Sequence, residues 1–193
     1  MKIKHWMLSA TMTFCALFLV MQQANAQDSK NTATENIEFV DLDGKSIHLS
    51  DYKGKWVIIN LWATWCPPCL VEIPDLVMFQ EAHKGKDAVV LGVNYEANDP
   101  QKVKNFAESQ MINYPVVRFK GRIDGRTTPF GSLKGLPTTY MVTPEGKLVA
   151  ERVGMVDQKM LETFIERYAS LKTNEKSKQD KSKQGDSKEE KSK

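Results

Sequence analysis

Few cysteine and histidine side chains are available in this sequence to hold a structural zinc ion or a covalently attached haem. Cysteine and histidine occur only three times each among the 193 residues. A structural zinc site needs about four ligands, usually in closely spaced pairs, whereas His48 and His83 stand far apart and form no such pair. Covalent haem attachment needs a histidine directly after a Cys-x-x-Cys motif, and Leu70 occupies that position after Cys69. The scarcity of ligands therefore argues against both kinds of site.

A basic surface is missing as well, once the two ends of the chain are set aside. The whole chain has 27 basic and 24 acidic residues, for a formal net charge of +3. Two lysines in 1–26, and eight lysines against five acidic residues in 172–193, account for this surplus. The segment 27–171 is left with 17 basic and 19 acidic residues. It lacks the basic stripe that nucleic-acid binding requires, and we expect no nucleic-acid partner.

Only one long apolar run occurs, and it lies near the N-terminus. Residues 6–21 are mostly apolar, Lys2 and Lys4 precede them, and alanines at 24 and 26 follow. This is the pattern of a cleaved secretory signal, so we expect residues 1–26 to be removed and the protein to be periplasmic. A retained membrane anchor is the alternative, because a run of about 16 residues is near the short limit for spanning a bilayer.

The other end of the chain has almost nothing to bury. Residues 172–193 are mostly Lys, Glu, Asp, Ser and Gln, with no apolar side chain able to join a core. Such a composition predicts disorder. We therefore predict a disordered tail at 172–193, a flexible segment at 27–35 and one folded domain at 36–171.

The domain at 36–171 alternates strand patterns with helix patterns. Continuous apolar and β-branched runs predict buried strands, and apolar residues at helical spacing predict helices. The predicted elements are an edge hairpin at 36–49, strands at 55–63, 87–95, 114–119, 138–142 and 147–153, and helices at 70–83, 100–110 and 157–171. The segment 121–135, rich in Gly, Thr and Arg, is predicted to be a loop with at most one helical turn around 129–133. This order predicts an α/β fold, with a central mixed β-sheet and helices on both faces.

Two cysteines remain after the predicted cleavage, because Cys15 lies inside the signal. They stand in the sequence "WCPPC" as Cys66 and Cys69. A purely structural disulfide across so short a loop would constrain little of the unfolded chain. Cys66 lies where a buried strand ends and a helix begins, so the helix dipole favours its thiolate, which is the form that attacks disulfides. We predict a reactive couple in which Cys66 attacks and Cys69, one helical turn later, resolves.

The residues around this pair resemble those of a known family. The stretch "WATWCPPCLVEIP" at 62–74 follows an apolar strand, and "GLPTTYMVTPEGKLV" at 135–149 comes about seventy residues later. Together they resemble the thioredoxin superfamily, and more closely the TlpA, ResA and DsbE (CcmG) group of exported thiol-disulfide reductases. The resemblance covers roughly 36–169. It implies a thioredoxin-like fold with an N-terminal β-hairpin extension and a central helix-strand insertion around 96–119.

The resemblance also implies a substrate-facing surface beside the cysteines. Pro137 matches the family's cis-proline, which lies against the redox pair. Leu136 would then present its backbone to an extended substrate strand, while Pro137 keeps the thiols accessible. Trp65, Pro67 and Pro68 are expected to share this surface.

One position departs from ordinary thioredoxins. Those proteins carry a buried Asp six residues before the first cysteine, where it assists proton transfer, and this chain has Asn60 there. In the reductase group the role is attributed to the Glu that matches Glu72. A poorly solvated carboxyl one turn after Cys69 would have a raised pKa and could accept a proton near neutral pH. The alternative is an ordinary exposed helical glutamate.

The two prolines bear on the direction of electron flow. Pro67 and Pro68 lack N–H groups, so two potential donors to the Cys66 sulfur are absent and its thiolate is less stabilised. A less stabilised thiolate makes the couple more reducing. We therefore favour a disulfide reductase over a disulfide oxidase or isomerase. A copper or haem chaperone that uses the thiols for binding is a third hypothesis.

The resemblance further implies the partners of such a reductase. They are a disulfide-containing exported protein, in cytochrome c maturation or a related assembly, and a membrane electron donor of the DsbD or CcdA type. We expect a monomer without a cofactor beyond the Cys66–Cys69 disulfide. The loop at 121–135 is longer than expected for the group, and its Arg122, Arg126 and Lys134 could shape partner choice. A plain solvated loop is the simpler interpretation.

Overall fold

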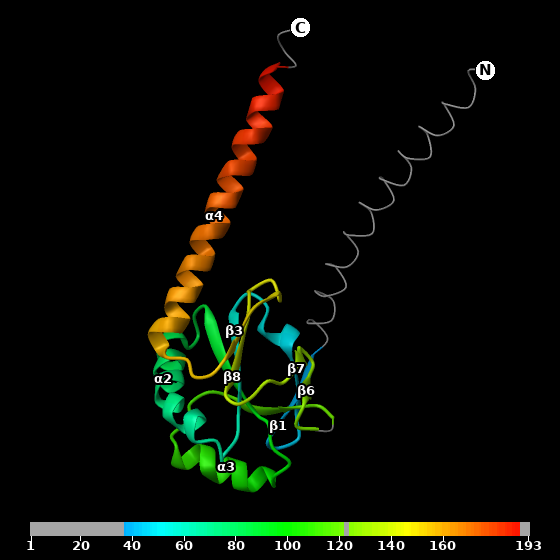
Figure 1. Ribbon diagram of the computed structural model, residues 1–193, viewed down its shortest axis with the longest axis vertical. Helices are drawn as coiled ribbons and strands as arrows, with labels where there is room; N and C mark the ends of the chain where they lie inside the picture. Colours follow the sequence, from blue (N-terminus) through cyan, green and yellow to red (C-terminus); the bar gives the residue numbers. More distant parts are fainter. Residues whose placement is uncertain (1–36, 122–123, 190–193) are drawn as a thin grey trace, which may run out of the picture.

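The computed structural model describes residues 37–121 and 124–189 (Figure 1). The expected signal at 1–26 and the flexible segment at 27–35 lie outside these residues. Within the part of the chain that the structure describes, no helix is both long enough and apolar enough to cross a membrane.

A seven-stranded mixed sheet forms the centre of the molecule. Its spatial order is β2-β1-β5-β4-β3-β8-β9. The central strand β4 pairs in parallel with both β3 and β5, whereas the outer pairings are antiparallel. The strands are β1 (Glu38–Asp41), β2 (Ser46–His48), β3 (Trp56–Trp62), β4 (Ala88–Asn94), β5 (Val116–Phe119), β8 (Thr138–Val142) and β9 (Leu148–Val153). The predicted edge hairpin, the buried strands and the mixed sheet are all confirmed.

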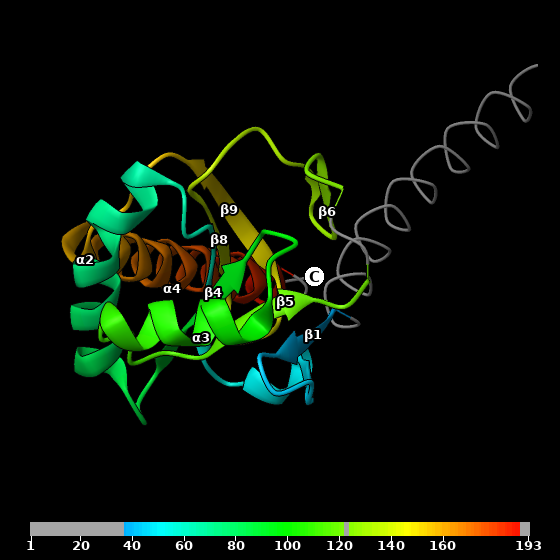
Figure 2. The same ribbon diagram turned by 90° about the horizontal axis from the view of Figure 1, so that it is seen from below.

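Helical segments cover the two faces of the sheet unequally. The α-helices of the described residues are α2 (Pro67–His83), α3 (Pro100–Ser109) and α4 (Gln158–Glu189). Figure 2 shows them grouped on one side of the sheet, away from the short strand β6 (Thr127–Thr128). The other face is covered by the single 3-10 turn η1 (Leu49–Tyr52) and by side chains from the segment that precedes β8. Helices therefore lie on both faces, as predicted, but within 37–121 and 124–189 the second face carries only a short one.

Strand β3 lies between the apolar clusters on the two faces of the sheet, and every one of its residues is buried. Alternate side chains of a strand point to opposite faces. Val57, Ile59 and Leu61 join the core beneath η1, whereas Ile58 packs with residues of α2 and α4 on the helical face. Asn60 belongs to the same set of positions as Ile58, so the strand directs its amide toward the helical face.

The segment that was predicted as a loop at 121–135 contains a small hairpin instead of a helical turn. Strands β6 (Thr127–Thr128) and β7 (Gly131–Ser132) pair antiparallel. Gly131 adopts a φ of +127°, which other residues rarely tolerate, and this permits the tight reversal after Pro129. The Asp124 carboxylate also accepts hydrogen bonds from the backbone N–H groups of Arg126 and Thr127, at 2.8 Å each. Local turn chemistry therefore overrides the expected helical turn.

The closing helix is longer than predicted. We expected it to end near Leu171 and the chain to be disordered from 172 onward, whereas α4 continues to Glu189 and projects well beyond the sheet (Figure 1). Lysine, glutamate and glutamine have good helix propensity, and the segment contains no proline. An ion pair of 3.2 Å between Lys172 and Glu175, one turn apart, adds local support of the kind known in isolated helices. Asp157 caps the start of this helix, since its carboxylate accepts a hydrogen bond from the backbone N–H of Met160 at 2.7 Å.

Candidate active site

The cysteine pair lies at the junction of β3 and α2, as predicted. Cys66 is the N-cap residue of α2, and Pro67 and Pro68 fill the first turn of that helix. Proline suits these positions because the first N–H groups of a helix have no partner within it. Cys66 and Cys69 are joined in a disulfide, so the structure represents the oxidised protein. Both cysteines are buried in this state.

The peptide bond between Leu136 and Pro137 is cis, as the resemblance implied. Pro137 is buried, and its carbonyl accepts a hydrogen bond of 2.9 Å from the backbone N–H of Gly154. The Thr138 hydroxyl donates to the Gly135 carbonyl at 2.7 Å. These bonds hold the turn before β8 in place.

A groove of about 410 Å³ opens beside the disulfide. Its lining includes Trp65, Cys66, Pro67 and Pro68 from the start of α2 and Leu136 from the segment before β8. Trp65 is two-thirds exposed, at 67%. Five of the residues predicted for the reactive, substrate-facing side are thus gathered around one depression, while Pro137 lies buried behind Leu136.

Glu72 is not an exposed helical glutamate. Its side chain is only 2% exposed, and both carboxylate oxygens accept hydrogen bonds. Oε1 accepts from Asn60 Nδ2 at 2.7 Å, and Oε2 accepts from the backbone N–H of Val156 at 2.9 Å. Asn60 Nδ2 also lies 3.1 Å from Thr139 Oγ1, its register partner on β8. The carboxyl is therefore held in one orientation between α2, strand β3 and the segment before α4.

The environment of Glu72 places its titration near neutral pH. Burial raises the pKa of Glu72 to about 7, although the hydrogen bonds from Val156 and Asn60 act to lower it. The nearby Asp75 carboxylate adds to the rise. A carboxyl with such a pKa can both accept and release a proton at physiological pH.

Two further residues near the site were not identified from the sequence. Glu96 follows β4 and is buried; it accepts hydrogen bonds from Thr64 N at 3.2 Å, Thr64 Oγ1 at 3.1 Å and Asn94 Nδ2 at 2.7 Å. It thereby fixes the turn that leads to Cys66. Tyr95 lines the groove. Their place in the sequence could have identified them, because both directly follow strand β4. Residues that follow parallel strands gather at one edge of the sheet, where ligands bind.

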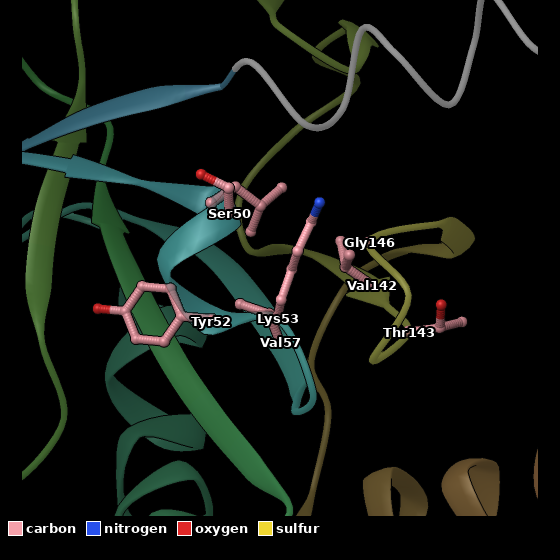
Figure 3. Close-up of a pocket in the computed structure, with 8 residues that line it drawn as sticks. Ser50, Tyr52, Lys53, Val57, Val142, Thr143 and Gly146 are labelled. Atoms are coloured by element: carbon pink, nitrogen blue, oxygen red, sulfur yellow. The ribbon is translucent and has the colours of Figure 1, made fainter.

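A separate small hollow lies at the opposite end of β3 (Figure 3). It is lined by η1 residues, by Val57 at the start of β3, and by Val142 and Gly146 near the turn between β8 and β9. None of the predicted site residues lines it. The redox groove is therefore the depression that matches the sequence analysis.

Comparisons with known proteins agree with this geometry. The model of the AhpC/TSA family matches residues 26–151. The thiol-disulfide oxidoreductase ResA of Bacillus subtilis (strain 168) is 33% identical over 137 residues, which cover 71% of this chain and 74% of ResA.

Solved structures extend the similarity to the fold. The crystal structure of a thiol:disulfide interchange protein of the thioredoxin family from Chlorobium tepidum TLS is 32% identical, with a TM-score of 0.52, and the match covers 69% of this chain and 94% of that one. An exposed lipoprotein thioredoxin from Streptococcus pneumoniae strain TIGR4 is 25% identical, with a TM-score of 0.52 and coverage of 68% and 98%. The chain therefore belongs to the AhpC/TSA family, and within it to the thioredoxin-like thiol-disulfide oxidoreductases of the ResA type.

Proposed function

We propose that this oxidoreductase works as an exported disulfide reductase, with Glu72 as the proton acceptor for its resolving thiol. The observation that carries the proposal is the buried carboxyl one helical turn after Cys69, whose pKa is raised to about 7. A proton acceptor is most effective when its pKa lies near the working pH. The usual thioredoxin acceptor is replaced here by Asn60, which cannot titrate.

The reaction proceeds in two exchange steps. In the reduced protein, the Cys66 thiolate attacks one sulfur of a substrate disulfide. A bond forms between Cys66 and that sulfur, the substrate S–S bond breaks, and the other substrate sulfur leaves as a thiolate that takes a proton from water. Glu72 then takes the proton of the Cys69 thiol, and the Cys69 thiolate attacks Cys66. The Cys66–Cys69 bond forms, the bond between Cys66 and the substrate breaks, and the second substrate sulfur leaves as a thiolate that takes a proton from water. The two substrate thiols together then hold the two electrons that the dithiol gave up.

Features of the first helical turn support reduction over oxidation. Thiol-disulfide proteins that are strong oxidants stabilise the reduced form of their cysteine pair. Pro67 and Pro68 occupy the first turn of α2 and offer no N–H to a Cys66 thiolate. The dithiol is less stabilised and gives up its electrons more readily. A disulfide oxidase or isomerase is the alternative direction.

Export and partners complete the proposal. The signal-like pattern at 1–26 and the exposed lipoprotein thioredoxin among the relatives support an extracytoplasmic location. Such compartments are oxidising, so the spent disulfide requires a membrane electron donor of the DsbD or CcdA type. Substrates are proposed to be exported proteins that need free thiols for cytochrome c maturation or a related assembly.

The reduction potential tests the direction. A value near about −270 mV supports a reductase, whereas a value near about −120 mV contradicts it. Trapping tests the partner: Cys69→Ala should accumulate a mixed disulfide through Cys66 in the native host, and Cys66→Ala is the matched control. A trapped membrane donor together with an exported thiol protein fits the proposal, and recovery of neither contradicts it.

A further inference from the structure

The redox groove has a second wall that comes from the segment before β8. Residues 133–136 line the groove together with Trp65, Pro67 and Pro68. This segment leads directly from the β6–β7 hairpin to the cis peptide at Pro137. A ligand that enters the groove to reach Cys66 therefore meets residues of the first turn of α2 and residues of this wall.

The hairpin that carries this wall is anchored at both ends. At one end the Tyr95 hydroxyl donates a hydrogen bond of 2.6 Å to the Thr127 carbonyl. The Thr127 hydroxyl and two backbone N–H groups hold the pKa of Asp124 well below its ordinary value, so the turn keeps its charged cap at every physiological pH. At the other end the Phe130 ring packs on Tyr140, with centroids 4.4 Å apart. A wall fixed in this way can discriminate between ligands without first paying an ordering cost.

The groove contains one cation. Among the described residues that line it, Lys134 alone carries a formal charge. Its side chain is 65% exposed, and its ammonium lies 3.4 Å from the Glu151 carboxylate. A long, exposed ion pair of this kind contributes little free energy. The ammonium can therefore turn from Glu151 to a ligand carboxylate at little cost.

We propose that Lys134 makes the groove select extended substrate segments that carry an acidic residue next to the disulfide-bonded cysteine. An apolar neighbour on the other side of the cysteine would pack against Trp65 and Leu136. The inference rests on the proposed function, since it assumes that substrate disulfides enter this groove. Lys134 takes no part in the sulfur exchange; it is a specificity residue that attracts the carboxylate while Cys66 attacks.

Charged peptide disulfides test the preference. The reduced protein is mixed with symmetric disulfides of the amidated pentapeptide Gly-X-Cys-Leu-Gly, acetylated at its N-terminus, in which X is aspartate, asparagine or lysine. The rate constant of reduction is measured at low and high salt. We expect the aspartate peptide to react roughly threefold faster than the lysine peptide, as one exposed charge pair allows. The difference should shrink at high salt because exposed charges are screened.

Variants separate Lys134 from the intrinsic reactivity of the peptides. Lys134→Met keeps most of the side-chain stem and should remove the preference, Lys134→Glu should reverse it, and Glu151→Gln should strengthen it by freeing the ammonium. Lys159→Glu, an exposed lysine on α4, is the control and should leave the ratio unchanged. An aspartate-to-lysine ratio that is the same in the wild type and in Lys134→Met overturns the inference. Failure to reduce even the asparagine peptide would instead refute the proposed function, and the inference with it.

Discussion

The side-chain amide of Asn60 donates a hydrogen bond of 2.7 Å to a carboxylate oxygen of Glu72 inside the molecule. The residue that stands where thioredoxins have their buried acid thus holds the acid that is proposed to replace it. A hydrogen bond to the charged form lowers a carboxyl pKa, whereas burial raises it. The balance between these two effects sets the pKa of Glu72 near 7.

Removing the amide should shift this balance. In Asn60→Leu the carboxylate loses one of its two hydrogen-bond donors while burial remains, so the pKa of Glu72 should rise above 7. The carboxyl can be titrated by difference infrared spectroscopy or by carbon NMR. Asn94→Leu is the matched control, because Asn94 is also buried but donates to Glu96. An unchanged or lowered pKa in Asn60→Leu would contradict this account of the site.

The charge of Asp75 should act in the opposite direction. Its carboxylate raises the pKa of Glu72, so Asp75→Asn should lower that pKa toward the ordinary value. The same titration measures the change. Glu81→Gln, an exposed position on the same helix, should have no effect, and equal effects of the two substitutions would show that Asp75 has no specific influence.

Burial of Glu72 should also make stability depend on pH. The folded-state pKa is raised from 4.5 to about 7, so the folded protein binds this proton more tightly than the unfolded chain does. The resulting stabilisation is fully present below about pH 4.5 and is lost as the pH rises to about 7, with a total on the order of 3 kcal/mol. Urea unfolding of the oxidised protein between pH 4.5 and 8 measures it.

The Glu72→Gln variant isolates this contribution. Its amide cannot titrate, so the loss of stability across that pH window should be smaller than in the wild type. The comparison uses the slope of the unfolding free energy against pH and not its absolute value. The glutamine NH2 group would face one of the two N–H donors that the carboxylate accepts from, and this lowers the stability of the variant at every pH. If the unfolding free energies of the wild type and of Glu72→Gln changed in parallel with pH, Glu72 would titrate at its ordinary pKa in the folded protein.

The hairpin wall of the groove can be loosened without touching the cysteines. Tyr95→Phe removes the hydrogen bond of 2.6 Å to the Thr127 carbonyl and should destabilise the fold by about 1 kcal/mol. Amide hydrogen exchange should accelerate at 127–133 and remain unchanged in α2. Tyr168→Phe, at a partly buried position that packs against the core of the opposite face, should not accelerate exchange in the hairpin. Undisturbed exchange in Tyr95→Phe would mean that the bond does not anchor the wall.

Most of the regular structure could be predicted because its signals are local. The apolar run of β3 and the prolines that open α2 identify the strand, the helix and the junction that carries Cys66. Glu72 could be proposed from the resemblance to the reductase group, with its spacing to Cys69 in support. The hydrogen bond from Asn60 could not, because it depends on the packing of α2 across β3 and on the register between β3 and β8.

Other features escaped prediction for physical reasons that differ between them. Strands β6 and β7 have two residues each, too few to show a periodicity, and they form through turn geometry at Gly131. Glu96 acts only through a turn brought to it by a neighbouring strand. The extension of α4 beyond Leu171 carries no apolar stripe, so it resembles a solvated tail in composition while its residues remain good helix formers.

The most direct test of the proposed mechanism is the rate at which Cys69 resolves a mixed disulfide on Cys66, measured from pH 5 to 9. The wild-type rate should rise through a midpoint near pH 7, where Glu72 becomes able to accept a proton. In Glu72→Gln the midpoint should disappear and the rate at pH 7 should fall by about tenfold or more, while Glu81→Gln should behave as the wild type does. A Glu72→Gln profile that overlies the wild-type profile would contradict the role of Glu72 as proton acceptor.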